Sequence, residues 1–526
     1  MKIISFEEAA ALIKDTSTVA VSGSGASNIL PEKLLAAVEN RYFETKAPKS
    51  LTIVHPQGLG DKDKGGIARF AHKGMCKRVI GGHWAMSPAM GQLAMEEEVE
   101  AYNFPQGVMA QLIRNMSARG PGVITKIGLG TYIDPRQSGG RINQSAKDDL
   151  VELIEIDGEE WMRYKPIPID VALIRGTTAD EDGYISYEEE VHYDEVLAMA
   201  AAAKNNGGIV IVQVKQLAKR ETLDFAKTKI PGYLVDYVVV DPNQKQSYEY
   251  FYNPSYCGAI KKPVDFTWPG EKFNERKFIA RRQAMELGPD MLVNIGVGVS
   301  NGVPFILAEE GLLDTITLSL EQGQSGGIPV MGLDAGTMIN PRIILDHPVQ
   351  HDLYHGGVLD ATCLSAAEID FRGNVNVSKL GKSITGCGGF IDISQETKLI
   401  VFGGTLCAKS KVRFEDGKVI VEEQGKVKKF INEIQQITFN GDYAVKIGKK
   451  VIFITERCVF KLTPEGLMLV EVAPGIDIDR DILDNMEYKP LIAKDLKEMP
   501  AFLFNSGPMG LKEYWSERDD KRGVTG

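Results

Sequence analysis

The sequence has no run of the roughly 20 apolar residues that a helix needs to span a bilayer. Its first 15 residues carry Glu7 and Glu8 within an apolar stretch, a pattern typical of an amphipathic helix and not of a signal peptide. The chain holds six cysteines at irregular spacing, and none forms a C-x-x-C pair. We therefore expect a reduced, cytoplasmic protein with no disulfide framework and no membrane partner.

An excess of basic residues is also missing. The chain has 60 Lys and Arg against 71 Asp and Glu, a net charge of -11. A nucleic-acid partner requires a basic face, so this balance argues against one. The 526 residues, 43% of them hydrophobic, are enough for two large domains with substantial cores.

Complete cofactor motifs are absent. The turn at Gly23 and Gly25 has Asn28 where G-x-G-x-x-G needs a glycine, and the turn starting at Gly296 has its third glycine one residue late. His351 and His355 have the i, i+4 spacing of a metal pair, but no H-E-x-x-H surrounds them. No histidine accompanies a G-x-S-x-G nucleophile motif. We expect neither a metal nor a nucleotide cofactor.

Strand-like and helix-like segments alternate along the chain, which predicts an α/β fold with mostly parallel strands. The chain also repeats itself. Residues 23–31 (GSGASNILP) match residues 296–304 (GVGVSNGVP), and residues 172–187 resemble residues 362–377. We interpret the repeats as two homologous open α/β domains, residues 1–253 and 276–526, joined by a linker at residues 254–275 that is rich in prolines and polar residues.

A third, weaker match aligns residues 52–60 with residues 318–326, and it places Pro56 where the second half has Glu321. Only the second half would then carry this acid. Glu321 ends a short apolar run and precedes a glycine-rich stretch. The residues alone leave two interpretations open, a nucleophilic carboxylate or an ordinary capping or ion-paired acid.

A second candidate is the loop Gly386-Cys387-Gly388-Gly389. Such a loop can present backbone N–H groups to an oxyanion or a phosphate, because no large side chain stands in the way. The alternative is a tight turn with no ligand, and the sequence alone does not decide between them.

Beyond these single features, the chain resembles the class I coenzyme A transferases of the propionate or acetate CoA-transferase type over nearly its whole length. The matching segments are Lys77–Trp84, Ala101–Val108, Gly128–Asn143, Pro231–Pro242, Tyr354–Asp360, Gly373–Ser378, Gly386–Ser394, Ile454–Phe460 and Glu471–Ile478. The segment Glu321–Gly327 is similar to the family motif E-[ST]-G-x-x-G-G, with Gln322 in place of Ser or Thr.

The resemblance implies that Glu321 is the catalytic nucleophile and that coenzyme A is a substrate, exchanged between short-chain carboxylic acids such as acetate, propionate, butyrate or lactate. It implies an oxyanion and CoA-binding set of Gly386, Cys387, Gly388, Gly389, Gly296, Val297, Gly298 and Asn376. For the acyl pocket we expect Gln106, Gln322, Asp334 and Gly58. Asp334-Ala335 departs from the apolar residue and Phe usual in the family, so the acyl substrate stays open.

The family also implies a homo-oligomer, a dimer or a tetramer. Three alternatives remain: an acyl-CoA hydrolase in which water replaces the acceptor acid, a CoA-binding pseudoenzyme, and a phosphosugar isomerase of a related fold that would ignore CoA.

Overall fold

The computed structural model describes residues 1–264 and 273–523. The chain forms two compact units. Unit 1 comprises Met1–Lys262, Leu320–His355 and Ser378–Asp392, and unit 2 comprises the described parts of Pro263–Ser319, Gly356–Val377 and Ile393–Gly526. Each unit is therefore built from separate stretches of the chain.

This division differs from the ranges that the repeats suggested. The stretch that holds Glu321 packs in unit 1, although its sequence repeat belongs to residues 276–526. Of the expected linker, residues 254–275, the part 265–272 lies outside the described residues. The boundaries of the two homologous domains stay a prediction.

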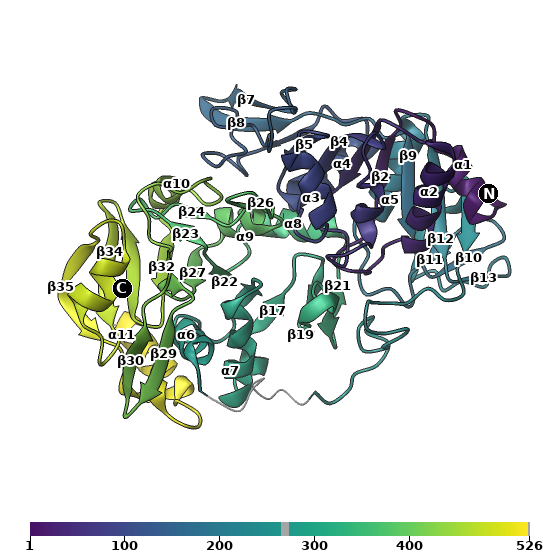
Figure 1. Ribbon diagram of the computed structural model, residues 1–526. Coiled ribbons are helices and arrows are strands. Elements are labelled where there is room, and N and C mark those ends of the chain that lie inside the picture. Colours follow the sequence, from purple (N-terminus) through teal and green to yellow (C-terminus); the bar gives the residue numbers. More distant parts are fainter. Residues whose placement is uncertain (265–272, 524–526) are drawn as a thin grey trace. The chain divides into compact units, whose positions relative to one another are not determined.

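Unit 1 is organised around an eight-stranded sheet whose strands all pair in parallel (Figure 1). In spatial order the strands are β1 (Lys2–Ile3), β15 (Tyr237–Val240), β12 (Ile209–Val214), β9 (Val171–Arg175), β2 (Thr18–Val21), β3 (Leu51–His55), β4 (Cys76–Gly81) and β5 (Glu100–Asn103). The central strands are largely apolar, as expected of parallel strands covered on both faces.

Helices cover both faces of this sheet. Side chains of α1 (Phe6–Leu12), α2 (Glu32–Thr45) and α3 (Pro88–Met95) join one face in a single core cluster, which includes Val19 and Val21 of β2. Helix α5 (Val196–Asn205) packs against β9 and β12, and it also contacts α4 (Gln106–Ser117), which in turn contacts α8 (His347–His355). A parallel sheet needs such cover, because both of its faces bury apolar residues.

Further strands complete unit 1. They are β6 (Val123–Thr125), β7 (Val151–Ile156), β8 (Glu159–Tyr164), β10 (Thr178–Asp180), β11 (Ile185–Ser186), β13 (Gln216–Ala218), β14 (Thr228–Ile230), β18 (Gln324–Ser325), β19 (Ile328–Pro329), β20 (Met338–Ile339), β21 (Ile343–Ile344), β25 (Lys379–Leu380) and β26 (Ser383–Ile384). The antiparallel pair β18–β21 carries the turn that contains Glu321.

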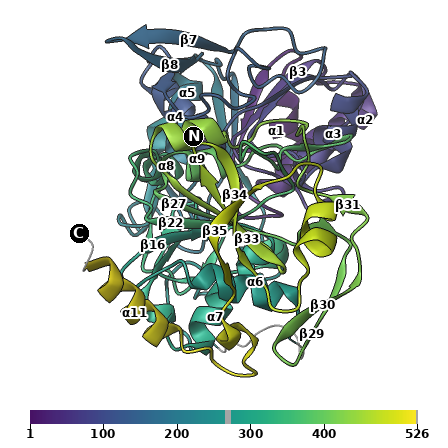
Figure 2. The same ribbon diagram turned by 90° about the vertical axis from the view of Figure 1, so that its left-hand side faces the viewer.

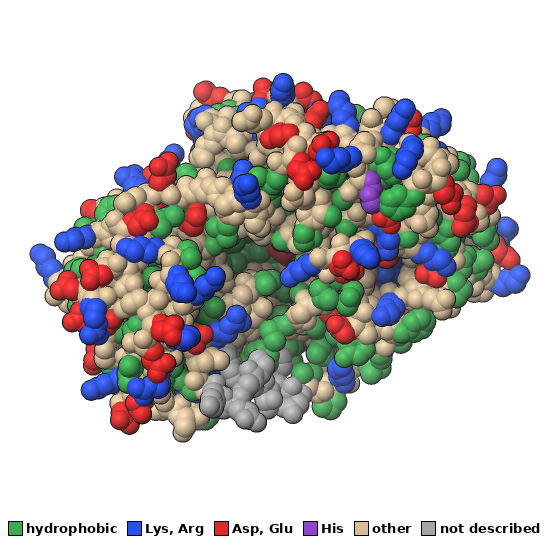
Figure 3. Space-filling view, in the orientation of Figure 1, with side chains coloured by type: hydrophobic (Ala, Val, Ile, Leu, Met, Phe, Trp, Pro, Cys, Tyr) green, Lys and Arg blue, Asp and Glu red, His purple; other side chains and the backbone are tan. Residues whose placement is uncertain are grey.

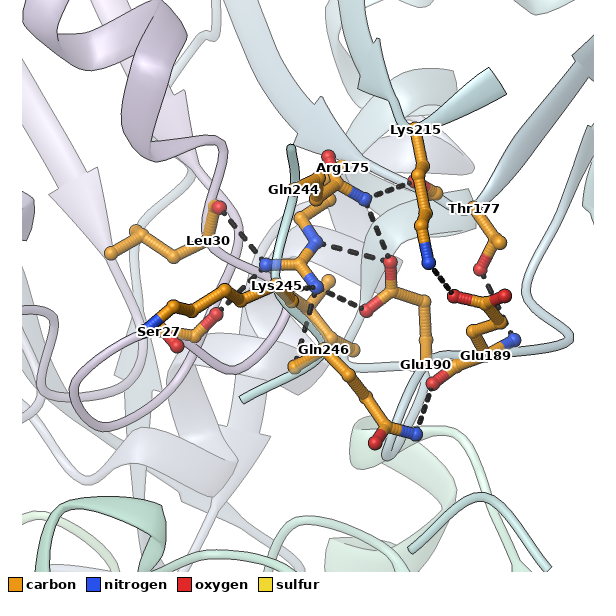
Figure 4. Close-up of polar contacts among 12 residues, drawn as sticks. Ser27, Leu30, Arg175, Thr177, Glu189, Glu190, Lys215, Gln244, Lys245 and Gln246 are labelled. Carbon is orange, nitrogen blue, oxygen red and sulfur yellow. Dashed lines mark hydrogen bonds and ion pairs between the residues drawn. The ribbon is translucent and has the colours of Figure 1, made fainter. Parts of the chain in front are cut away.

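A buried ion pair anchors the loops at one end of this sheet (Figure 4). Arg175, at the end of β9, donates to both carboxylate oxygens of Glu190 at 3.0 Å. Its remaining N–H groups donate to backbone carbonyls, including those of Ser27 at 2.9 Å and Lys245 at 2.6 Å. The guanidinium is thus fully satisfied, and it ties the turn after β2 to a segment more than 200 residues further along the chain.

Unit 2 is organised around strands of a second sheet. In spatial order its strands are β17 (Thr317–Ser319), β16 (Leu292–Ile295), β22 (Ala361–Ser365), β27 (Leu399–Gly403), β32 (Lys450–Ile454), β33 (Cys458–Thr463), β34 (Gly466–Val472) and β35 (Leu491–Glu498). Pairing is parallel from β17 to β32 and antiparallel through β33 and β34.

Helix α6 (Glu275–Ala284) packs against β27, β32 and α7 (Val303–Glu309), and Figure 2 shows α6 close to α7. The other elements of this unit are α10 (Gly441–Lys446), α11 (Leu511–Gly523), β23 (Glu368–Ile369), β24 (Val375–Asn376), β28 (Cys407–Ala408), β29 (Lys411–Glu415), β30 (Lys418–Glu423) and β31 (Val427–Lys428), and α9 (Phe390–Glu396) begins in unit 1 and ends in unit 2.

The sequence repeats correspond to equivalent strands. In unit 1 the order is β12-β9-β2-β3, and in unit 2 it is β27-β22-β16-β17. The first matched turn follows β2 and its counterpart follows β16, while the second matched pair begins in β9 and β22. The two sheets therefore share a topological core, as the repeats predicted.

On the face shown in Figure 3, acidic and basic side chains are interspersed. Within residues 1–264 and 273–523, every helix is too short or too polar to cross a lipid bilayer.

Candidate active site

Glu321 lies in a tight turn of unit 1. The turn is closed by two backbone hydrogen bonds, from Gly323 N–H to Leu320 O at 3.1 Å and from Leu320 N–H to Gln324 O at 2.8 Å. The following strand, β18, pairs with β21. The backbone of the turn at residues 320–324 is therefore fixed at both ends.

The Glu321 carboxylate rests on the backbone of Gly389. A Cβ at position 389 would lie 2.8 Å from Glu321 Cδ and closer still to Oε2, so only glycine fits beneath the carboxylate. The same Cβ would lie 3.2 Å from Gln106 Nε2. The structure thus brings together three residues that the sequence proposed from separate motifs: Glu321, Gly389 and Gln106.

Burial raises the pKa of Glu321 to about 7, and the negative charge of Asp392 acts in the same direction. The charge of His347 and the nearby side-chain amides of Gln322 and Gln106 oppose this rise in the pKa of Glu321. Gln322 Nε2 donates to Glu321 Oε1 at 3.2 Å. A carboxylate with a pKa near neutrality keeps more nucleophilic character than a solvated one and is a common mark of a functional group.

The glycine loop uses most of its own N–H groups to hold its shape. Gly386 donates to Ser378 O at 3.0 Å, Cys387 to Asn103 Oδ1 at 2.9 Å and Gly388 to Gly82 O at 2.8 Å. For the N–H of Gly389 no acceptor exists among the described residues. Of the four loop residues that we expected to offer N–H donors to a ligand, only Gly389 has an N–H group available for one.

Gln106 is the first residue of α4, and its side chain is buried. Its backbone N–H donates to Gly388 O at 3.0 Å, which joins α4 to the glycine loop. Its side-chain Nε2 is buried and has no hydrogen-bond acceptor among the described residues. An unsatisfied buried amide costs about 1–3 kcal/mol, so its retention beside Glu321 points to a ligand that it meets during function.

The carboxylate of Asp392 holds the N-terminus of α4 in place. It accepts from the N–H groups of Gly107 at 3.0 Å and Val108 at 3.2 Å, and from His355 Nε2 at 2.8 Å. An anion at a helix N-terminus is stabilised by the unpaired N–H groups and the helix dipole. Asp392 thereby fixes α4 and the start of α9 relative to each other, and both contribute to the Glu321 site.

The remaining acyl-pocket candidates are Asp334 and Gly58. Asp334 is buried and accepts from Ser247 Oγ at 2.9 Å and Glu249 N–H at 3.0 Å, so it holds a loop together. A Cβ on Gly58 would lie 2.5 Å from His83 Nδ1, which places Gly58 against this ring. Their roles in an acyl pocket remain predictions.

Four candidates belong to unit 2. Gly296 follows β16 and donates to Cys363 O at 2.8 Å. Val297 is 78% exposed, and Gly298 has a φ of 121° in the region that favours glycine. Asn376, in β24, donates to Glu368 Oε2 at 2.7 Å. The structure places them in a different unit from Glu321, and their part in CoA binding stays a prediction.

Sequence reasoning missed His347, His83 and Asp392. Asp392 lies within the segment Gly386–Ser394 that carries the glycine loop, and His83 follows Gly81 and Gly82 at the end of β4. His347 had no motif around it. His351, His355 and Asp392 have potential ligand atoms within 4.8 Å of one another, but both Asp392 oxygens already accept hydrogen bonds. The absence of a metal stays a prediction.

Comparisons with known proteins show the family of this chain. Residues 3–241 match the family model described as "Coenzyme A transferase". The chain is 44% identical over 509 residues to acetate CoA-transferase YdiF of Escherichia coli K12, covering 97% of this chain and 96% of the relative. It is also 44% identical over 518 residues to caffeate CoA-transferase of Acetobacterium woodii, covering 97% and 98%.

Solved structures give the same result. The apoenzyme of acyl-CoA transferase YdiF from E. coli O157:H7 superposes with a TM-score of 0.92 at 43% identity, covering 97% of each chain. A YdiF thioester complex with CoA gives a TM-score of 0.91 at 43% identity, with the same coverage. The expected α/β fold is confirmed, as is coenzyme A as a substrate. The chain belongs to the coenzyme A transferase family and is an enzyme of that class.

Proposed function

We propose that the protein moves CoA between short-chain carboxylic acids by a ping-pong mechanism with Glu321 as the nucleophile. The observation that carries the proposal is the contact of the Glu321 carboxylate with Gly389 beside the unsatisfied amide of Gln106. The relative crystallised as a thioester with CoA supports it by similarity.

In the first step a carboxylate oxygen of Glu321 attacks the thioester carbonyl of the donor acyl-CoA. The tetrahedral oxyanion collapses by breaking the C–S bond, which leaves a mixed anhydride and CoA thiolate. Thiolate is a good leaving group, because the pKa of a thiol is about 8.5. No proton is transferred, so the step needs no general base.

The thiolate then attacks the glutamyl carbonyl of the anhydride. This gives a glutamyl-CoA thioester and releases the donor acid as its carboxylate. An acceptor carboxylate reverses both steps and leaves as a new acyl-CoA. The free energy of the thioester is conserved throughout, so no ATP is consumed.

Each step passes through an oxyanion, and we propose the N–H of Gly389 and Nε2 of Gln106 as its donors. These two groups have no acceptor among the described residues, whereas the other loop amides are engaged. One such donor is worth about 3 kcal/mol in a transition state. Water would hydrolyse the mixed anhydride. We therefore expect the loops near Gly58 and Gln106 to exclude water from it.

The test is to mix the protein with acetyl-CoA, quench with borohydride and analyse the peptide that contains residue 321. Borohydride reduces a thioester to an alcohol, so the Glu321 side chain should be found reduced only when acyl-CoA was present. Glu321→Gln serves as the unlabelled control. Turnover without any modification of Glu321 would remove the basis of the proposal.

A turnover assay with acetyl-CoA as donor should test acetate, propionate, butyrate and lactate as acceptor acids. It should also test caffeate, the acid in the name of one relative. Capture of CoA by added carboxylate separates a transferase from a hydrolase. We further propose a cytoplasmic homo-oligomer. The six unpaired thiols of Cys76, Cys257, Cys363, Cys387, Cys407 and Cys458 support a reducing compartment.

A further inference from the structure

Glu321 and His347 flank the same short antiparallel ladder. β18 pairs with β21 through Gln324 and Ile344, and the next hydrogen bond runs from Leu345 N–H to Gly323 O at 2.9 Å. Glu321 and His347 each lie two residues beyond this bond. The register therefore places Glu321 and His347 at the same end of the β18–β21 pair.

His347 is held rigidly in a fully buried position. Its Nδ1 lies 2.8 Å from Glu195 Oε2, and its backbone N–H donates to Asp194 O at 2.9 Å. The ring packs against His351, with 4.8 Å between ring centroids. The carboxylate of Glu195 accepts the hydrogen bond from Nδ1–H of His347. The second ring nitrogen is therefore available for another contact. That nitrogen, Nε2, is buried and has no partner among the described residues.

The charges around His347 favour its protonated form. Burial lowers the pKa of His347, but the hydrogen bond to Glu195 and the charges of Glu195, Asp194 and Glu321 together raise it above its ordinary value. In the other direction, His347 opposes the rise in the pKa of Glu321. The titratable groups that surround the two are His192, Asp194, Glu195, Asp346, His351, His355 and Asp392.

His351 does not compete for this role. Burial lowers its pKa well below the usual range, and the neighbouring charges of His347 and His355 add to the effect. Its ring also lies against the backbone of Gly107, where a Cβ would be only 2.7 Å from Cε1. The neutral His351 therefore separates the imidazole of His347 from His355 and Asp392.

We propose that His347, as an imidazolium paired with Glu195, is the positioning residue that keeps Glu321 in its carboxylate form between turnovers. The inference rests on the proposed role of Glu321 as nucleophile. A buried carboxylate without a counter-charge takes up a proton, and a protonated acid cannot attack a thioester. The negative charge of Asp392 raises the pKa of Glu321, so a positive counter-charge is needed to keep the carboxylate ionised.

A cavity of about 180 Å³ has Asp194, Glu195 and Asp346 among its lining residues. Arg114, in the wall of the same cavity, is exposed to solvent, so the cavity reaches the surface.

The experiment is a pH profile of kcat/KM for CoA exchange between pH 5.5 and 9 in the wild type and in His347→Gln. In the wild type, activity should fall below about pH 7 as Glu321 takes up its proton. In His347→Gln this acid limb should move up by at least about one pH unit, which means at least about an eightfold extra loss of activity at pH 6.5. Much of the activity should return at pH 9.

Glu195→Gln is the second variant, since it leaves the imidazole in place and removes the anion that keeps it charged. Its acid limb should move in the same direction by a smaller amount. His72→Gln is the matched control, because His72 forms a similar pair with Glu39 at 2.8 Å on the periphery of unit 1. Its profile should coincide with that of the wild type.

An acid limb that stays at its wild-type pH in folded His347→Gln or Glu195→Gln overturns the inference, even if the rate falls at all pH values. Loss of folding in both variants also overturns it, because the pair would then be structural. Borohydride labelling of wild-type Glu321, run in parallel, keeps the two proposals apart. Absence of the label refutes the nucleophile, whereas a label with an unmoved limb refutes only the role of His347.

Discussion

Unit 1 contains two buried polar centres that are built in opposite ways. Around Arg175 each guanidinium nitrogen has an acceptor, and Glu190 receives two of these hydrogen bonds. Around Glu321, the side-chain nitrogens Gln106 Nε2 and His347 Nε2 have no acceptor among the described residues. A satisfied centre stabilises the fold, whereas an unsatisfied one costs stability that only a ligand can recover. Variants at the two centres should therefore have opposite effects.

The largest effect is expected for Glu321→Gln. Removal of the nucleophile should lower CoA exchange by about 10⁴-fold or more. The folded protein should become more stable at pH 8. The unfolded glutamate ionises near its ordinary pKa of 4.5 and the folded one near 7, so ionisation destabilises the native state as pH rises through this window. At about 1.4 kcal/mol per unit, the gain in the amide variant is up to about 3 kcal/mol.

Exchange assays and thermal unfolding at pH 4.5 and pH 8 check both parts. Glu423→Gln, on the exposed hairpin β29–β30, is the control that should change neither. Equal stability of wild type and Glu321→Gln at the two pH values would contradict the buried, charge-destabilised state of the carboxylate.

Arg175→Met should act on stability and spare the chemistry. Leaving Glu190 buried without its partner should lower the free energy of unfolding by about 3–5 kcal/mol. Urea denaturation measures this, and the folded fraction should keep near-normal exchange. Arg413→Met, which removes an ion pair from exposed side chains, should cost at most about 1 kcal/mol. A loss of activity greater than the loss of folded protein would show that the Arg175 centre also serves the reaction.

Gly389→Ala should lower kcat by about 10²-fold. The added Cβ would overlap the Glu321 carboxylate, and a displacement of about 1 Å at a reacting group has an effect of this size. Steady-state kinetics provides the measurement. Gly91→Ala is the control, because nothing lies within 4 Å of its added methyl group in α3, where alanine favours the helix. Full activity of Gly389→Ala would mean that the carboxylate does not rest on this residue.

Among the variants beside Glu321, Gln106→Leu should give the smallest change in rate, about 10- to 100-fold in kcat/KM, with no loss of stability. Its Nε2 is unsatisfied in the free protein, so its removal should be neutral or stabilising by about 1 kcal/mol. The matched control is Gln111→Leu on the same helix, whose amide donates to Asp352 at 2.9 Å. Comparable destabilisation of both variants would contradict the distinction between satisfied and unsatisfied amides.

The α/β alternation and the repeat of one turn in both halves were predictable from the sequence, because apolar runs and glycine-rich turns are local signals. The turns after β2 and β16 occupy equivalent places in two similar sheets, as the repeat indicated. The assignment of residues 320–355 and 378–392 to unit 1 was not predictable. It depends on packing between distant segments, such as Asp392 on the N-terminus of α4, which leaves no periodic pattern in the sequence.

The same reasoning applies within the site. Glu321 and the glycine loop stood in recognisable motifs, and the structure brings Glu321 and Gly389 into contact. The engagement of Gly386, Cys387 and Gly388 by protein acceptors was not foreseeable, because composition shows where N–H groups are available but not where their acceptors lie. His347 was missed for a similar reason, since its partner Glu195 is 152 residues away.

The composition of unit 1 has a consequence for any attempt to divide this protein. A cut after Lys262 would leave α4 and Gln106 on one fragment and Glu321, Gly389 and Asp392 on the other. Neither piece could assemble the nucleophile with its donors, so catalysis would return only when the fragments combine.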